Sequence, residues 1–217
     1  MEQMGIIRKI SEPTVWCAGM VVVPKKMGDI RICVDLQPLN KNVVREIHPI
    51  PSVDEILAQL AGAKIFSKLD ANSGFWQIPL AKESQPLTTF ITPFGRYCFN
   101  KLPFGICSAP EVYQKNMSQI LDGLPGVLCL IDDILIFGQD KTEHDQRLRD
   151  TLTRLQQANV TLNRKKCRFN QQSLKFLGHI MDSQGIRADP EKTTAIENME
   201  TPSQLLTCAD LWAWSIS

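Results

Sequence analysis

Residues 127–137 read VLCLIDDILIF, an apolar run that is interrupted only by Asp132 and Asp133. Burying one unpaired carboxylate is costly, so two adjacent ones need a specific explanation. One explanation is a hairpin whose tip exposes both groups to water, because Asp is a common turn residue. The other is a divalent metal ion, whose charge offsets the repulsion between the carboxylates. The run by itself leaves both explanations open.

A third carboxylate, Asp70, ends an apolar strand predicted over residues 64–69. Taken alone, Asp70 has the simpler interpretation of a turn or helix cap. Together with Asp132 it could hold two magnesium ions about 3.5–4 Å apart, the arrangement used for in-line phosphoryl displacement. The spacing in the sequence does not show whether the two residues meet in space.

Local patterns along the rest of the chain predict a mixed α+β fold. Strands are expected at 18–24, 30–34, 64–69, 88–91, 97–99, within 127–137, at 174–177 and at 179–181. Ser52 with Glu55, and Ser108 with Glu111, have the spacing of a capping box and predict two helix starts. Thr142 is the expected cap of a third helix.

Composition sets outer limits on the function. The 217 residues are 43% hydrophobic and 22% charged, which is ordinary for a globular protein and argues against disorder. Neither a membrane helix nor a signal segment is recognisable, so an intracellular protein, cytoplasmic or nuclear and not secreted, is expected. The seven cysteines lack C-x-x-C spacing, which argues against a disulfide framework or a zinc knuckle. A net charge of +1 gives no independent reason to propose nucleic-acid binding.

Four motifs occur in the order of a reverse transcriptase. They are FSKLD at 66–70, LPFG at 102–105 followed by SAP at 108–110, IDD at 131–133 and FLGH at 176–179. Over about residues 12–200 the chain resembles the reverse transcriptase domain of gypsy-type LTR retrotransposon polyproteins. The resemblance implies an α+β right-hand polymerase with fingers and a ferredoxin-like palm, its thumb largely missing. Fingers are expected at 1–61 and 81–107, the palm at 62–80 and 108–185, and the start of a thumb with an aberrant tail at 186–217.

The resemblance also implies roles for particular residues. Asp70 and Asp132 match the palm aspartates that bind two Mg²⁺ ions, with Mn²⁺ as an alternative, and Asp133 completes the aspartate pair. Lys166 matches the lysine proposed to protonate pyrophosphate, although Lys165 lies close enough in sequence to confuse that assignment. Leu177, Gly178 and His179 match the primer grip, a hairpin that presses the primer end toward the metals.

Contacts to the incoming nucleotide follow in the same way. Phe75 matches the steric gate that excludes a 2′-hydroxyl, and Phe104 matches a position near the nucleotide and the template base. Without the family, Phe75 would be read as a core aromatic. Lys25 or Lys26, with Arg31, matches the cations that hold the triphosphate, whereas the local pattern around the two lysines is that of a solvated turn.

The implied function is RNA-directed DNA polymerisation, with a primed RNA or DNA template and deoxynucleoside triphosphates as partners and no membrane. One departure from the family is Leu130, which stands where tyrosine usually precedes the aspartate pair by two positions. The alternative is therefore a catalytically inactive retroelement remnant that folds and binds nucleic acid. Another metal enzyme with a polymerase-like palm, such as a nucleotide cyclase, fits the LPFG and FLGH motifs less well. The oligomeric state stays open.

Overall fold

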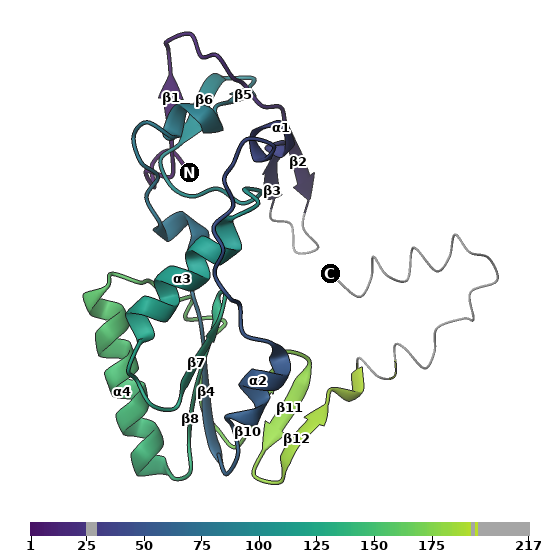
Figure 1. Cartoon of the computed structure of the whole chain (residues 1–217), viewed down its shortest axis with the longest axis vertical. Helices are drawn as coiled ribbons and strands as arrows, with labels where there is room; N and C mark the ends of the chain where they lie inside the picture. Colours follow the sequence, from purple (N-terminus) through teal and green to yellow (C-terminus); the bar gives the residue numbers. More distant parts are fainter. Residues whose placement is uncertain (25–29, 192–193, 195–217) are drawn as a thin grey trace, which may run out of the picture.

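The structure, a computed structural model, describes residues 1–24, 30–191 and 194, and Figure 1 shows them in two parts with helix α3 where the parts meet. The upper part contains β1 (Ile7–Ile10), β2 (Met20–Pro24), β3 (Ile30–Val34), α1 (Gln37–Asn40), η2 (Gln85–Thr88), β5 (Phe90–Thr92) and β6 (Gly95–Phe99). The lower part contains α2 (Val53–Ala58), β4 (Ile65–Asp70), η1 (Gly74–Gln77), α3 (Ala109–Leu121), β7 (Val127–Leu130), β8 (Asp133–Gly138), α4 (Lys141–Gln157), β9 (Arg168–Gln171), β10 (Ser173–Phe176), β11 (His179–Asp182) and β12 (Gly185–Ala188).

The centre of the lower part is an antiparallel sheet in the order β7-β8-β4-β9. Successive side chains of a strand point to opposite faces, so each strand contributes to two cores. Leu69, Ile134 and Ile136 pack on the side of α3 and α4. Phe66 and Leu135 pack on the other side, against α2 and the β10–β11 hairpin. Both faces of this sheet are therefore covered, which explains why its strands read as nearly continuous apolar runs.

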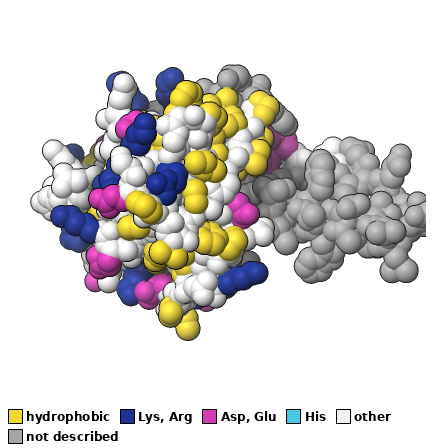
Figure 2. All heavy atoms as spheres, turned by 90° about the horizontal axis from the view of Figure 1, so that it is seen from above, with side chains coloured by type: hydrophobic (Ala, Val, Ile, Leu, Met, Phe, Trp, Pro, Cys, Tyr) yellow, Lys and Arg dark blue, Asp and Glu magenta, His cyan; other side chains and the backbone are white. Residues whose placement is uncertain are grey.

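Two smaller sheets, β1-β6-β5 and β2-β3, form the upper part around a core of their own. Figure 2 views the molecule from this end and shows hydrophobic side chains exposed among lysines, arginines and carboxylates. On the two-stranded β2–β3 hairpin the exposed hydrophobic residues are Val21, Val22, Val23, Ile30 and Ile32. A two-stranded hairpin has no second layer to bury its side chains, which accounts for this exposure.

Two of the three predicted helix starts are confirmed, at Ser52 and Ser108, and the third helix begins two residues earlier than predicted. Ser52 caps α2 as predicted, because its hydroxyl accepts from the Glu55 amide at 3.2 Å and the Glu55 carboxylate accepts from the Ser52 amide at 2.8 Å. The capping box expected at Ser108 is wrong, since Ser108 makes no side-chain cap bond at the start of α3. The expected cap at Thr142 is also wrong, because α4 begins earlier and its cap is Asp140.

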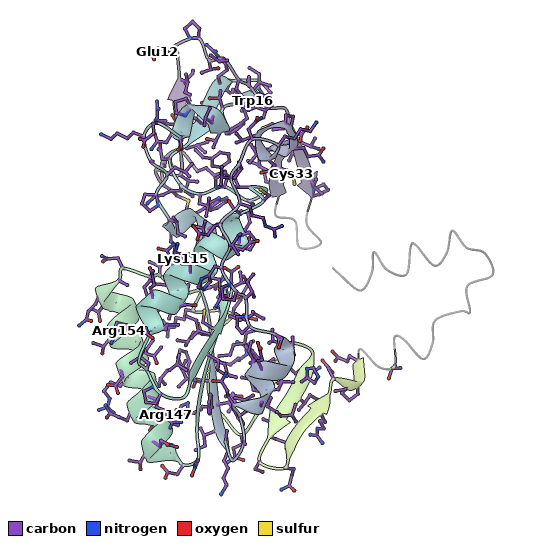
Figure 3. The ribbon with its side chains drawn as sticks, viewed as in Figure 1. Glu12, Trp16, Cys33, Lys115, Arg147 and Arg154 are labelled. Atoms are coloured by element: carbon purple, nitrogen blue, oxygen red, sulfur yellow. The ribbon has the colours of Figure 1, made fainter. Side chains whose placement is uncertain are left out.

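The segment that connects the two parts is tied to α3 by ion pairs. Arg45 pairs with Glu111, the side chain that the predicted capping box would have used. Lys115, labelled in Figure 3, pairs with Glu46 at 2.9 Å. Glu111 is buried, and the hydrogen bond from Arg45 holds the pKa of its carboxyl below the usual range. A partner from outside the helix has therefore displaced the local cap.

Helix α4 is attached to its neighbours by two arginines that Figure 3 labels. Arg147 donates to the Phe137 carbonyl at 2.8 Å, and Arg154 donates to the Ile120 carbonyl at 3.0 Å. These bonds link α4 to the end of β8 and to α3, so the helix position relative to the sheet is defined at both ends. Within the described residues no helix combines the length and the apolar character needed to cross a membrane.

A buried polar contact joins β4 to α4. Ser67 Oγ lies 2.9 Å from His144 Nε2, and His144 Nδ1 lies 3.1 Å from Asp145 Oδ1. This is the residue set of a hydrolytic triad, but Ser67 and His144 are 0% exposed, so no substrate can reach them. Ser67 also accepts from the Asn170 amide on β9 at 3.1 Å. The contact therefore serves the packing of β4, β9 and α4.

Replacing His144 with leucine is expected to lower the free energy of unfolding by about 1–3 kcal/mol, since the substitution leaves buried polar atoms without a partner. Urea denaturation followed by circular dichroism measures this change. Asp150→Asn, on the exposed face of α4, is the control and should stay within about 0.5 kcal/mol of the parent protein. Equal stability of His144→Leu and the parent would show that the contact contributes nothing to the fold.

Candidate active site

The structure brings the three aspartates together at one end of the central sheet. Asp70 is the last residue of β4, and Asp133 is the first residue of β8, directly opposite Asp70 in the antiparallel register. Asp132 lies in the turn between β7 and β8, where its carbonyl accepts from the Ala71 amide at 2.9 Å. Residues that are about sixty positions apart in sequence are thus held side by side by strand pairing.

The turn that carries Asp132 has an unusual backbone. Ile131 has a φ of 51°, a region that β-branched residues rarely adopt. Gln114 on α3 stabilises this turn, because its side chain accepts from the Ile131 amide at 2.8 Å and donates to the Cys129 carbonyl at 2.9 Å. Gln114 is 2% exposed. Sequence reasoning missed this residue, because nothing in the sequence distinguishes Gln114 from Asn116 and Gln119 of the same helix.

Each of the three carboxylates has a different set of neighbours. Lys166 Nζ donates to Asp70 Oδ2 at 3.2 Å, and Lys68 Nζ donates to Asp133 Oδ2 at 2.8 Å. Asp132 differs, because its Oδ1 is buried and has no hydrogen-bond partner among the described residues. Both candidate lysines line the cleft next to Asp70, and Lys166 is the one whose ammonium pairs with that carboxylate.

The electrostatics of the site centre on Asp132. Burial raises the pKa of its carboxyl, and the negative charges of Asp70 and Asp133 raise it further, while Lys166 opposes the shift. Tyr113, buried beneath the site, has its hydroxyl pKa raised by burial and by the charge of Asp132. Ionisation of the Asp132 carboxyl is therefore less favourable in the folded protein than in water.

This shift predicts a pH-dependent gain in stability when Asp132 is replaced by asparagine. A raised pKa in the fold means that the folded state binds the proton more tightly than the unfolded state, so ionisation of Asp132 opposes folding. Asp132→Asn should therefore unfold at a higher urea concentration at pH 7.5. The gain should shrink as pH falls through the raised pKa and disappear below the ordinary aspartate value of about 4. A loss of stability in Asp132→Asn at pH 7.5 would contradict the raised pKa of Asp132. Asp150→Asn is the control and should show no gain in stability.

An aromatic group lies beside the aspartates. The Phe75 ring is 5.0 Å from that of Phe104 and 5.5 Å from that of Tyr113, measured between centroids. Phe75 stands on η1, whose first residue is Gly74. A Cβ at Gly74 would lie 2.4 Å from Asp132 Oδ1 and 2.7 Å from the Tyr113 hydroxyl. Only glycine allows η1 to approach the aspartate turn this closely.

A cleft of about 500 Å³ opens next to Asp70. Its charged lining consists of Lys68, Asp70, Lys165, Lys166, Arg168 and Lys175. The excess of cations makes it suited to phosphate groups. Strand β10 also lines this cleft through Ser173, Leu174 and Lys175. In the turn that follows β10, Leu177 has a φ of 51° and Gly178 a φ of 78°, and His179 Nδ1 lies 3.1 Å from the Leu177 carbonyl oxygen.

Two sets of predicted residues lie outside the described part of the chain. Lys25 and Lys26 lie outside the described residues, and Arg31 lies on β3 with its side chain outside them as well. The predicted thumb and tail beyond residue 191 also lie outside, except for residue 194.

A metal ion at this site would have few protein ligands. Among the described residues, no group of three or more His, Cys, Asp or Glu side chains is arranged to hold a metal ion. The partnerless Asp132 Oδ1, next to the charge of Asp70, nevertheless suits a cation, because carboxylate oxygens are hard ligands and the added charge would relieve the repulsion. The protein would then supply only part of the coordination shell.

An antiparallel sheet that presents carboxylates from a strand end and an adjacent hairpin turn, with two helices behind it, defines the palm of a right-hand polymerase. The comparisons with known proteins agree. Residues 23–181 match the reverse transcriptase (RNA-dependent DNA polymerase) family, and the chain belongs to this family.

Relatives in sequence are retrotransposon polyproteins. The chain is 37% identical over 208 residues to the retrovirus-related Pol polyprotein from transposon opus of Drosophila melanogaster, covering 94% of this chain and 21% of that protein. Its identity to the transposon gypsy polyprotein of the same species is 34%, covering 91% of this chain and 20% of that protein. The chain thus spans about a fifth of these relatives.

Similar solved structures show the same fold. The foamy viral protease-reverse transcriptase in complex with double-stranded DNA superimposes with a TM-score of 0.87 at 26% identity, covering 94% of this chain and 36% of that one. Its complex with an RNA/DNA hybrid superimposes with a TM-score of 0.84 at 24% identity, covering 98% of this chain and 28% of that one. The predicted α+β fold of fingers and palm is confirmed.

Proposed function

We propose that this chain is the polymerase domain of a retrotransposon reverse transcriptase and extends a primer 3′-hydroxyl with deoxynucleotides on an RNA or DNA template. The observation that carries the proposal is the convergence of Asp70, Asp132 and Asp133 at one sheet end within a chain of this family. The upper part then corresponds to fingers and the lower part to palm. The expected boundary at residue 61 would put α2 in the fingers, but in this division α2 belongs with the palm, because it packs in the same core as Phe66 and Leu135 of the central sheet.

Asp70 and Asp132 are the residues that would hold two divalent ions, Mg²⁺ or Mn²⁺. Such ions, when bound, increase the acidity of the attacking hydroxyl and neutralise charge on the leaving pyrophosphate. Asp132 Oδ1 offers a lone pair that no described hydrogen bond occupies. The substrate phosphates and water would complete the coordination, which agrees with the small number of protein ligands.

The remaining residues bind and orient the substrates. The Lys166 ammonium would give a proton to the departing pyrophosphate, and its position 3.2 Å from Asp70 Oδ2 supports this role. Phe75 and Phe104 form the apolar surface below the sugar and base, and Lys25, Lys26 and Arg31 are proposed to hold the triphosphate. Leu177, Gly178 and His179 would press the primer terminus toward Asp70 and Asp132.

Primer extension tests the proposal. The chain should add deoxynucleotides to a DNA primer on an RNA template when Mg²⁺ is present, and chelation should stop the reaction. The extension rate of Asp132→Asn should be lower by at least about a thousandfold. This substitution removes a carboxylate charge at the point where charge develops in the transition state. Asp150→Asn, a carboxylate on the far helix, should retain it.

The same assay separates the proposal from the alternative of an inactive remnant. One observation favours that alternative: Leu130, two positions before Asp132, packs its side chain into the apolar core and offers no hydroxyl. A folded parent chain that binds a primed template in a gel-shift assay but extends it no faster than Asp132→Asn would overturn the catalytic proposal and support the remnant.

A further inference from the structure

Lys68 is a charged residue on β4 that none of the assigned roles uses. Its ammonium donates to Asp133 Oδ2 at 2.8 Å, and the two side chains are only 23% and 26% exposed. The same ammonium lies 5.7 Å from the centroid of the Phe176 ring. Phe176 is buried and immediately precedes the Leu177–Gly178 turn. Lys68 therefore contacts both the aspartate pair and the hairpin proposed as primer grip.

The position of Lys68 follows from the strand register. Asp70 stands opposite Asp133 and Lys68 stands opposite Leu135, so the lysine reaches Asp133 diagonally across β4 and β8. Diagonal neighbours in an antiparallel pair are within reach of long side chains. Because Asp70 and Asp133 are directly paired, they share one face of the sheet, and Asp133 would otherwise be an unpaired carboxylate next to Asp70.

We propose that Lys68 is a positioning residue that neutralises and orients Asp133, so that the cation site of this chain is made by Asp70 and Asp132 and does not include Asp133. Asp132 Oδ1 remains without a described partner, whereas Asp133 Oδ2 is taken by the lysine. The contact with the Phe176 ring further restrains the ammonium. This inference rests on the proposed function in assuming that Asp70 and Asp132 bind the cation.

Removing the lysine charge should change cation binding in a predictable direction. A positive charge a few ångströms from a divalent ion weakens binding, and its loss strengthens it by about tenfold for a separation of about 5 Å in water. Lys68→Met keeps most of the apolar stem over Phe176 but frees Asp133. We therefore expect tighter cation binding and a less specific arrangement of ligands, with slower primer extension at saturating nucleotide.

The experiment titrates Tb³⁺ by its luminescence, with Mg²⁺ as competitor, in the parent chain and three variants. Because Tb³⁺ is trivalent, Lys68→Met should bind it about 50-fold more tightly. Lys68→Arg should resemble the parent because it keeps the charge. The double variant Lys68→Met with Asp133→Asn should bind Tb³⁺ with the affinity of the parent chain, because the Asp133 carboxylate that Lys68→Met frees is no longer present. Thermal unfolding of each variant confirms that it is folded.

The outcomes distinguish this inference from the proposed function. Unchanged cation affinity in folded Lys68→Met, or no return in the double variant, would overturn the role of Lys68. Loss of Tb³⁺ binding in Asp132→Asn verifies that the titration reports the proposed site. Primer extension is measured separately, so an inactive chain that shows the expected affinity pattern would refute polymerase activity and leave the role of Lys68 intact.

Discussion

Primer extension by the Gly74→Ala variant is expected to fall by about 100-fold or more, with a smaller effect on stability. The added Cβ would lie 2.4 Å from Asp132 Oδ1 and 2.7 Å from Tyr113 Cζ, distances that real Cβ atoms do not show. The carboxylate is the end of a short side chain and can rotate away, whereas the buried Tyr113 ring is restrained by its neighbours. Misplacing a reacting group by about 1 Å can cost about 100-fold in rate.

Gly19→Ala is the matched control for this variant. A Cβ at Gly19 meets nothing within 4 Å, and this residue lies in the upper part of the chain, so activity and stability should both be preserved. Steady-state extension rates and thermal unfolding curves are measured for both variants. Extension by folded Gly74→Ala at the rate of Gly19→Ala would show that the close approach of η1 to Asp132 has no role in catalysis.

The second large effect concerns the choice of sugar. Phe75→Val is expected to increase ribonucleotide incorporation relative to deoxynucleotide incorporation by about 10–100-fold, the range that one added or removed group in an apolar pocket produces. The Phe75 ring contacts Phe104 and Tyr113, so it cannot swing aside to admit a 2′-hydroxyl. Valine removes the ring and keeps an apolar surface.

Competition between each ribonucleotide and its deoxynucleotide in single-turnover extension measures this ratio. Phe94→Val is a suitable control, because Phe94 is an exposed phenylalanine between β5 and β6, far along the sequence from η1. A ratio in Phe75→Val equal to that of Phe94→Val would argue against the steric-gate role and would leave Phe75 as a packing residue.

Sequence patterns predicted the helix cap correctly where both partners lie in the same stretch of chain. Ser52 and Glu55 are three residues apart, and the capping box forms because both partners belong to the same helix turn. The same pattern failed at Ser108, because Glu111 has a stronger partner in Arg45, 66 residues earlier in the chain. A charged pair with good geometry outcompetes a single neutral cap, and no local rule reports its presence.

The contacts that orient the aspartates were not predictable from the sequence. Gln114 supports the Ile131 turn from a neighbouring helix, and Lys68 reaches Asp133 across two strands. Ser67 and His144 are likewise 77 residues apart. Each contact depends on how α3, α4 and the strands pack, and each residue alone reads as an ordinary polar position.

The sequence by itself determined the family, the mixed α+β character and the candidate aspartates, because the motifs and the apolar runs are local properties of the chain. Only the tertiary structure decided that Asp70 and Asp133 are neighbours, that Lys68 pairs with one aspartate and Lys166 with another, and that Asp132 is left without a described partner. The reason is strand register. Burial of both faces of the central sheet selects one pairing of β4 with β8, and a shift by one residue would turn every side chain to the opposite face.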